Sequence, residues 1–224
     1  MADVQIAGVE FADNPDPRCP CVLLLDVSSS MAGEPIQALN EGLKAFHREV
    51  SLDSIAARRV EVAVISFGTG AEVVQDFVTV DLFNPPELRA GGQTHMGKGI
   101  ETALDLLAQR KATYKANGIS YYRPWIFLLT DGSSYGETDA TVDAARQRLL
   151  SEQRAGKTAF FAVGTETANF QKLETFTSPD RPPLKLKGIQ FVELFVWLSR
   201  SQQAVAQSQV GQQVALPPAG WATV

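Results

Sequence analysis

The sequence has few cysteines and few histidines. Its two cysteines, Cys19 and Cys21, flank Pro20. Two cysteines so close together on an extended segment do not easily form a disulfide. A metal site built from them would need further soft ligands nearby. The two histidines, His47 and His95, lie far away in the sequence. We therefore expect both cysteines to be reduced thiols with a structural role, as is usual in a reducing compartment.

Long apolar runs and basic clusters are also missing. No apolar stretch reaches the roughly 18 residues that a membrane-spanning helix needs. The first residues, Met-Ala-Asp-Val-Gln, lack the basic region and apolar core of a signal peptide. The net charge of −5, with no basic cluster, argues against nucleic acid or an anionic membrane as the main partner. We expect a cytoplasmic protein that binds neither nucleic acid nor membrane.

What is present is an alternation of apolar strands and amphipathic helices. The chain has 224 residues, of which 45% are hydrophobic and 20% charged, which suits one large α/β domain. Apolar or β-branched runs predict strands, and apolar residues at helical spacing predict helices. Strands are expected at residues 21–27, 60–67, 72–80, 125–130 and 158–163, and helices around residues 36–46, 100–107, 138–154, 170–176 and 189–203.

This order predicts a mainly parallel sheet with helices on both faces. The two strands around Gly68-Thr69-Gly70 are close enough to form a hairpin, which adds one antiparallel edge strand. No linker divides the chain. We expect a lead-in segment over residues 1–20, one domain over residues 21–203, and a tail over residues 204–224 that is extended or docked through Trp221.

The most informative residues follow the first predicted strand. Asp26, Ser28 and Ser30 place a carboxylate and two hydroxyls at alternate positions just after an apolar run. Hard oxygen ligands of this kind suit Mg²⁺ in octahedral geometry. Because hydroxyls are neutral, the charge of such an ion stays poorly compensated. The ion should therefore seek another carboxylate, which a partner protein could supply.

Two more loops add oxygen ligands. Thr94 follows Gly91-Gly92-Gln93 before the second predicted helix, and Asp131 ends the strand at residues 125–130. Ligands of open α/β sheets bind at the carboxyl ends of the strands, where Asp26 and Asp131 both lie. Either aspartate alone could be an ordinary helix cap. Together with the hydroxyls they favour a metal site made of Asp26, Ser28, Ser30, Thr94 and Asp131.

At these residues the sequence resembles a von Willebrand factor A domain with its metal-ion-dependent adhesion site. The family motif is Asp-x-Ser-x-Ser, then a distant Thr and a distant Asp, and all five match. The resemblance implies a Rossmann-like sheet wrapped by helices. It also implies that Ser28, Ser30 and Thr94 offer hydroxyls to the ion, while Asp26 and Asp131 bind it directly or through water. Ser29 stands where many members have Gly, which could stiffen the loop.

Three further blocks resemble the bacterial TerY/YegL group of stand-alone A domains. They are residues 14–21, 117–125 and 183–188. Members are associated with tellurite and chemical-stress resistance loci, beside a protein kinase and a PP2C-type phosphatase. The resemblance implies a cytoplasmic, non-enzymatic module that binds a partner's Asp or Glu through Mg²⁺, with Mn²⁺ or Ca²⁺ as other candidate ions. The neighbouring kinase or phosphatase is a candidate partner.

Other interpretations of the same loops are weaker. Residues 92–99 nearly spell a phosphate-binding P-loop, but Gly99 replaces the Ser or Thr that would hold magnesium, and Pro85-Pro86 oppose a preceding strand. His95 could be a general base for a metal-bound water, although no second acid or base is evident beside it. Glu34 and Glu137 are interpreted as solvated loop residues.

A metal-dependent hydrolase is the alternative function. Haloacid-dehalogenase enzymes also begin with a strand that ends in Asp, but they need a second Asp where Ser28 stands. A third possibility is a structural subunit that binds no metal. The residues favour a binding module over both.

Overall fold

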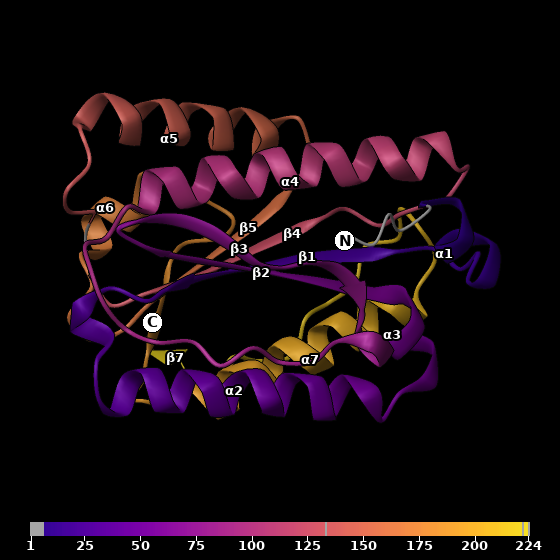
Figure 1. Ribbon diagram of the computed structural model, residues 1–224, viewed down its shortest axis with the longest axis horizontal. Helices are drawn as coiled ribbons and strands as arrows, with labels where there is room; N and C mark the ends of the chain where they lie inside the picture. Colours follow the sequence, from indigo (N-terminus) through magenta and orange to yellow (C-terminus); the bar gives the residue numbers. More distant parts are fainter. Residues whose placement is uncertain (1–6, 133, 221, 224) are drawn as a thin grey trace, which may run out of the picture.

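The fold is a twisted sheet between two layers of helices (Figure 1). The computed structural model describes residues 7–132, 134–220 and 222–223. Their seven strands lie in the order β3-β2-β1-β4-β5-β6-β7. The strands are β1 Cys19–Asp26, β2 Val60–Gly68, β3 Gly70–Thr79, β4 Trp125–Thr130, β5 Ala159–Gly164, β6 Leu184–Leu186 and β7 Ala222–Thr223. The helices are α1 Ala7–Asp13, α2 Glu34–Ser51, α3 Ser54–Arg59, α4 Met96–Ala116, α5 Asp139–Arg154, α6 Phe170–Glu174 and α7 Phe191–Gln207, with short 3₁₀ turns η1 Ser29–Met31 and η2 Val80–Leu82.

The strand pairing confirms the predicted fold class. Strands β2, β1, β4, β5 and β6 are parallel, and β3 pairs antiparallel with β2 as the expected edge strand. Strands β6 and β7 were not predicted, because segments of three and two residues carry no readable periodicity. β7 pairs antiparallel with β6 at the other edge of the sheet.

Two hydrophobic cores lie on opposite faces of the sheet. In β1, Leu23 and Leu25 pack with the core beneath α2 and α7, whereas Val22 and Leu24 pack with the core beneath α4 and α5. The alternation follows from the two-residue period of a strand. Because both faces are covered, β1 is buried along its whole length. This rigid central strand ends at Asp26 and so fixes the first residue of the predicted metal site.

Cys19 and Cys21 belong to the same core and form no disulfide. Burial raises the pKa of both thiols well above the ordinary value. A buried thiol that stays protonated is a poor nucleophile and a poor metal ligand.

The last helix extends further than the sequence predicts. Helix α7 continues to Gln207, beyond the predicted domain end at residue 203, and Gln202 in its last turns is buried. The chain then returns along α7, where the Trp197 Nε1–H group donates to the Pro217 carbonyl at 2.7 Å. The predicted docking of Trp221 lies outside the described residues. None of the helices in the described part of the chain is long and apolar enough to cross a membrane.

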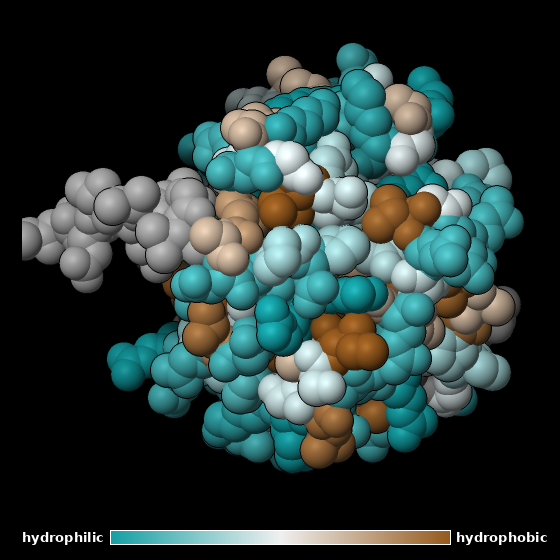
Figure 2. Space-filling model, turned by 90° about the vertical axis from the view of Figure 1, so that its right-hand side faces the viewer, coloured by the Kyte–Doolittle hydropathy of each residue, from teal (hydrophilic) through white to brown (hydrophobic). Residues whose placement is uncertain are grey.

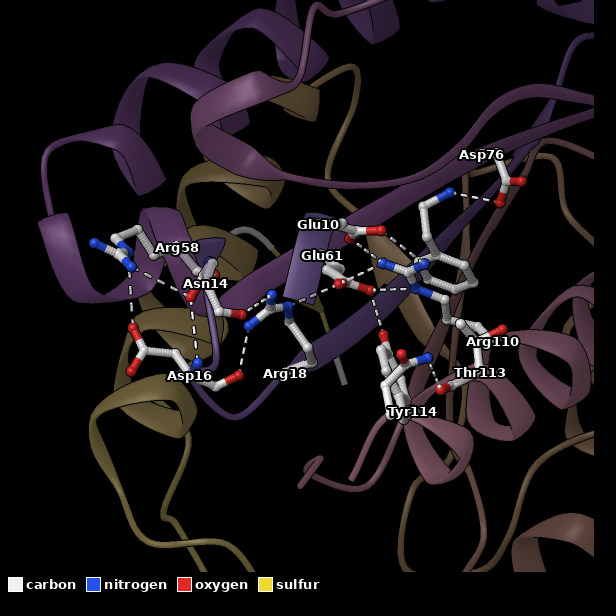
Figure 3. A network of polar contacts seen from close by, with 12 residues as sticks. Glu10, Asn14, Asp16, Arg18, Arg58, Glu61, Asp76, Arg110, Thr113 and Tyr114 are labelled. Atoms are coloured by element: carbon white, nitrogen blue, oxygen red, sulfur yellow. Dashed lines mark hydrogen bonds and ion pairs between the residues drawn. The ribbon is translucent and has the colours of Figure 1, made fainter. Parts of the chain in front are cut away.

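A buried network of charges lies at the amino-terminal edge of the sheet (Figure 3). The Glu61 carboxylate is fully buried at the start of β2 and accepts from Arg18 Nε at 2.9 Å and from Arg110 Nε at 2.8 Å. The Tyr114 hydroxyl also donates to it. Arg110 in turn forms an ion pair with Glu10 of α1. The network therefore joins the segment just before β1 to β2 and α4, and it holds α1 against them.

Candidate metal site

The carboxylate of Asp26 is held rigidly at the end of β1. Its Oδ1 atom accepts from the Ser28 N–H group at 2.8 Å, and its Oδ2 atom accepts from the Thr130 hydroxyl at 2.6 Å. Asp26 is completely buried, and this burial raises the pKa of its carboxyl, while the Ser28 and Thr130 hydrogen bonds act in the opposite direction. Both carboxylate oxygens are therefore oriented by the protein before any ion binds.

A chain of hydrogen bonds joins three further predicted site residues, Ser28, Ser30 and Asp131. The Ser28 and Ser30 Oγ atoms are 3.0 Å apart, and Ser30 Oγ donates to Asp131 Oδ1 at 2.9 Å. Asp131 follows β4, the neighbour of β1 in the sheet, and burial raises the pKa of its carboxyl. The turn η1 carries Ser30 back toward Asp131. The structure thus brings Asp26, Ser28, Ser30 and Asp131 together, as the sequence predicts.

The spacing of these oxygens fits a small hard cation. Octahedral Mg²⁺ binds oxygen at about 2.0–2.1 Å, so neighbouring ligand oxygens should be about 2.9 Å apart. The Ser28–Ser30 and Ser30–Asp131 oxygen distances of 3.0 and 2.9 Å match this separation between neighbouring ligands. Within the described residues, no group of three or more His, Cys, Asp or Glu side chains could hold a metal. An ion here would therefore depend on the hydroxyl ligands.

Thr94 approaches the same place from a third loop. The Ser29 N–H and hydroxyl groups both donate to the Gly92 carbonyl, at 3.1 and 3.0 Å. Thr94 itself is buried and pairs with Tyr135 through two backbone hydrogen bonds of 3.1 and 2.9 Å. Among the described residues, no hydrogen bond joins the Thr94 hydroxyl to the other four site residues. The loop of Thr94 is nevertheless fixed directly against the turn that carries Ser28 and Ser30, through Ser29.

His95 has a structural role in these loops. Its Nδ1 atom accepts from the Gly70 N–H group at 2.8 Å, so its Nε2 atom carries the proton and donates to Gln93 Oε1 at 2.8 Å. Both ring nitrogens are therefore occupied in tying the β2–β3 turn to the loop of Thr94. This arrangement does not fit the alternative in which His95 acts as a general base.

Glu137 was wrongly interpreted as a solvated loop residue. Its two carboxylate oxygens accept from the N–H groups of Gly97 and Lys98, each at 2.8 Å, at the start of α4. Sequence reasoning missed this cap because it comes from a loop 40 positions away. The same contacts count against a P-loop at residues 92–99, because a carboxylate already occupies the helix N–H groups that would bind phosphate.

Replacing Glu137 by alanine is expected to lower the free energy of unfolding by about 1–2 kcal/mol, because two helix N–H groups lose their acceptor. Urea unfolding followed by circular dichroism measures the change. Glu166→Ala is the matched control, since Glu166 is exposed and makes no ion pair within the described residues. Equal stabilities of the two variants would contradict the capping role.

The fold and the clustered oxygens together define an A domain. A family model of the von Willebrand factor type A domain matches residues 21–187, and the chain belongs to this family. Domains of this fold are known for metal-dependent protein interaction and are typically adhesion or interaction modules. No curated protein matches the sequence.

Solved structures of low sequence identity share the fold. A von Willebrand factor type A protein from Catenulispora acidiphila matches with 20% identity and a TM-score of 0.61, covering 84% of this chain and 43% of that one. The pilus adhesin SpaC from Lactobacillus rhamnosus GG matches with 17% identity and a TM-score of 0.63, covering 84% and 31%. The proximal thread matrix protein 1 of the mussel byssus, solved with a zinc-occupied MIDAS motif, matches with 16% identity and a TM-score of 0.59, covering 84% and 48%. This chain thus spans less than half of each of these proteins.

Proposed function

We propose that this protein is a metal-dependent interaction module that binds an Asp or Glu side chain of a partner protein through a divalent ion. Asp26, Ser28, Ser30, Thr94 and Asp131 would hold the ion, which supplies an open coordination position for the partner's carboxylate. The observation that carries the proposal is the hydrogen-bonded cluster of Ser28, Ser30 and Asp131 beside the oriented Asp26 carboxylate.

Magnesium is the proposed ion, with Mn²⁺ or Ca²⁺ as substitutes. The candidate ligands are all oxygen atoms, which suit these hard cations better than zinc.

Binding without catalysis is the proposed activity. A hydrolase at this site would need a free general base beside the ion. The nearest histidine, His95, has both ring nitrogens engaged with Gly70 and Gln93. The resemblance to the TerY/YegL group supports a cytoplasmic role in stress or tellurite resistance, with a kinase or PP2C-type phosphatase as the partner.

A capture experiment tests the proposal. Immobilised protein should retain its partner from a lysate of the native host in Mg²⁺ and release it in EDTA, and Asp26→Ala should retain none in either condition. Asp143→Ala is the control, because Asp143 is an exposed carboxylate on α5. Equal recovery from all variants, with or without Mg²⁺, would count decisively against a metal-dependent module.

A further inference from the structure

A groove lies between α4 and α5 in the carboxyl-terminal halves of both helices, at the end of the sheet opposite the metal site. The two helices run side by side on one face of the sheet (Figure 1). The groove has a volume of about 580 Å³. Segments that precede β4 and β5 close it below, and Val210 and Gly211 of the C-terminal segment border it.

The floor of the groove is apolar. Ala108 and Ala112 are exposed on α4, one helical turn apart, and their small side chains leave room between the helices. Leu104 and Pro124 lie deeper, and Val210 stays 46% exposed at the border. The groove can therefore receive an apolar side chain.

Its rim carries an excess of positive charge. Lys111, Lys115, Arg123 and Lys157 line the groove together with one carboxylate, Glu152. Glu152 is shared by Lys111 at 3.3 Å and Lys157 at 3.6 Å, and Lys115 has no ion pair within the described residues. A fifth cation, Arg148, is already neutralised by Glu101 and Asp105 on α4. Arg123 lies near Asp180 outside the groove and donates to the Gln153 and Thr158 carbonyls. The lining of the groove thus has more cations than carboxylates, in a protein whose net charge is −5.

The position of the helices decides which anion fits. Both α4 and α5 end beside the groove, and the carbonyl ends of helices carry partial negative charge. This partial charge opposes every anion, and it opposes a compact dianion such as phosphate more strongly than a single carboxylate, because phosphate concentrates two charges on one group and prefers helix amino termini. Lys111 and Lys157 share Glu152, whereas Lys115 on α4 and Arg123 before β4 come from other positions around the groove, so separate carboxylates can meet them. Figure 2, which looks onto this end of the molecule, shows a mostly hydrophilic surface with isolated apolar residues.

We propose that this groove binds an acidic peptide segment of a partner protein, with an apolar side chain over Ala108 and Ala112 and carboxylates at Lys115, Lys157 and their neighbours. The groove shares no residue with the metal site. Peptide binding is therefore independent of divalent ions, and the two sites allow the domain to join two partners at opposite ends.

A labelled octapeptide of glutamate and leucine serves as the probe, and fluorescence anisotropy measures its binding. We expect saturable binding that weakens with salt and is unchanged by EDTA. The double variant Lys115→Glu/Lys157→Glu should bind about tenfold or more weakly, because two exposed positive charges of the rim are reversed. Ala112→Trp should also abolish binding by filling the groove without any change of charge.

Lys44→Glu is the control, since Lys44 is an exposed lysine on α2, on the other face of the sheet. Thermal unfolding checks that every variant is folded. Equal affinities of the wild type and the double variant would overturn the proposal, as would the absence of saturable binding. Displacement of the peptide by submillimolar inorganic phosphate would identify a compact-anion site and would also overturn it. Loss of peptide binding in EDTA would assign the peptide to the metal site instead.

Discussion

Replacing Glu61 by alanine is expected to lower the free energy of unfolding by about 3–5 kcal/mol, which is the usual effect of breaking a buried ion pair by removing one partner. Arg18 is fully buried and Arg110 mostly so, and both donate to this carboxylate. The Tyr114 hydroxyl would lose its acceptor as well. The loss is large because uncompensated guanidinium charges would remain out of water.

Chemical denaturation of purified variants measures this effect. Glu61→Gln preserves the shape of the side chain without its charge and should lie between the wild type and Glu61→Ala. Glu10→Ala removes the partly exposed end of the same network and should have a much smaller effect. Similar stabilities of Glu61→Ala and Glu10→Ala would show that the buried network is not the source of stability. Metal affinity should not change in any of these variants, because the network lies at the amino-terminal ends of the parallel strands, whereas the metal site lies at their carboxyl ends.

Asp131→Asn is expected to weaken Mg²⁺ binding about 100-fold or more without destabilising the protein in EDTA. The substitution removes an anionic ligand but preserves the shape of the side chain. The charge of Asp131 also contributes to the raised pKa of the Asp26 carboxyl, so its removal relieves a repulsion between two buried carboxylates. The variant should therefore be at least as stable as the wild type in EDTA, and clearly less stable in Mg²⁺.

Thermal unfolding in the presence of Mg²⁺ and of EDTA measures both parts of this prediction. At a Mg²⁺ concentration about 100 times the dissociation constant, the wild type gains about 2.7 kcal/mol, whereas a variant that binds 100-fold more weakly gains only about 0.4 kcal/mol. Asp143→Asn is the control, because it makes the same change at an exposed carboxylate on α5. If Asp131→Asn gained as much from Mg²⁺ as the wild type, Asp131 could not be a ligand.

Features that depend on local sequence could be predicted. The apolar runs of β1 and β4 end at Asp26 and Asp131, and neighbouring parallel strands bring their carboxyl ends to one edge of the sheet. The roles of His95 and Glu137 could not be predicted, because their partners lie 25 and 40 positions away and nothing in the local pattern indicates them. The buried position of Glu61 was equally hidden. A charged residue at the start of an apolar strand is normally solvated, and only the convergence of Arg18 and Arg110 makes its burial favourable.

The hydrogen bonds around Ser28, Ser29 and Ser30 have a kinetic consequence. The chain's own groups already hold these loops in one arrangement, through Asp131 on one side and Gly92 on the other. A ligand that requires a rare conformer binds more weakly in proportion to the population of that conformer. Here the folded protein already holds the ligand oxygens at the spacing that the ion needs. Ion binding therefore requires no slow closure of these loops. The observed rate of ion binding should therefore rise in proportion to ion concentration, without a plateau set by a conformational step.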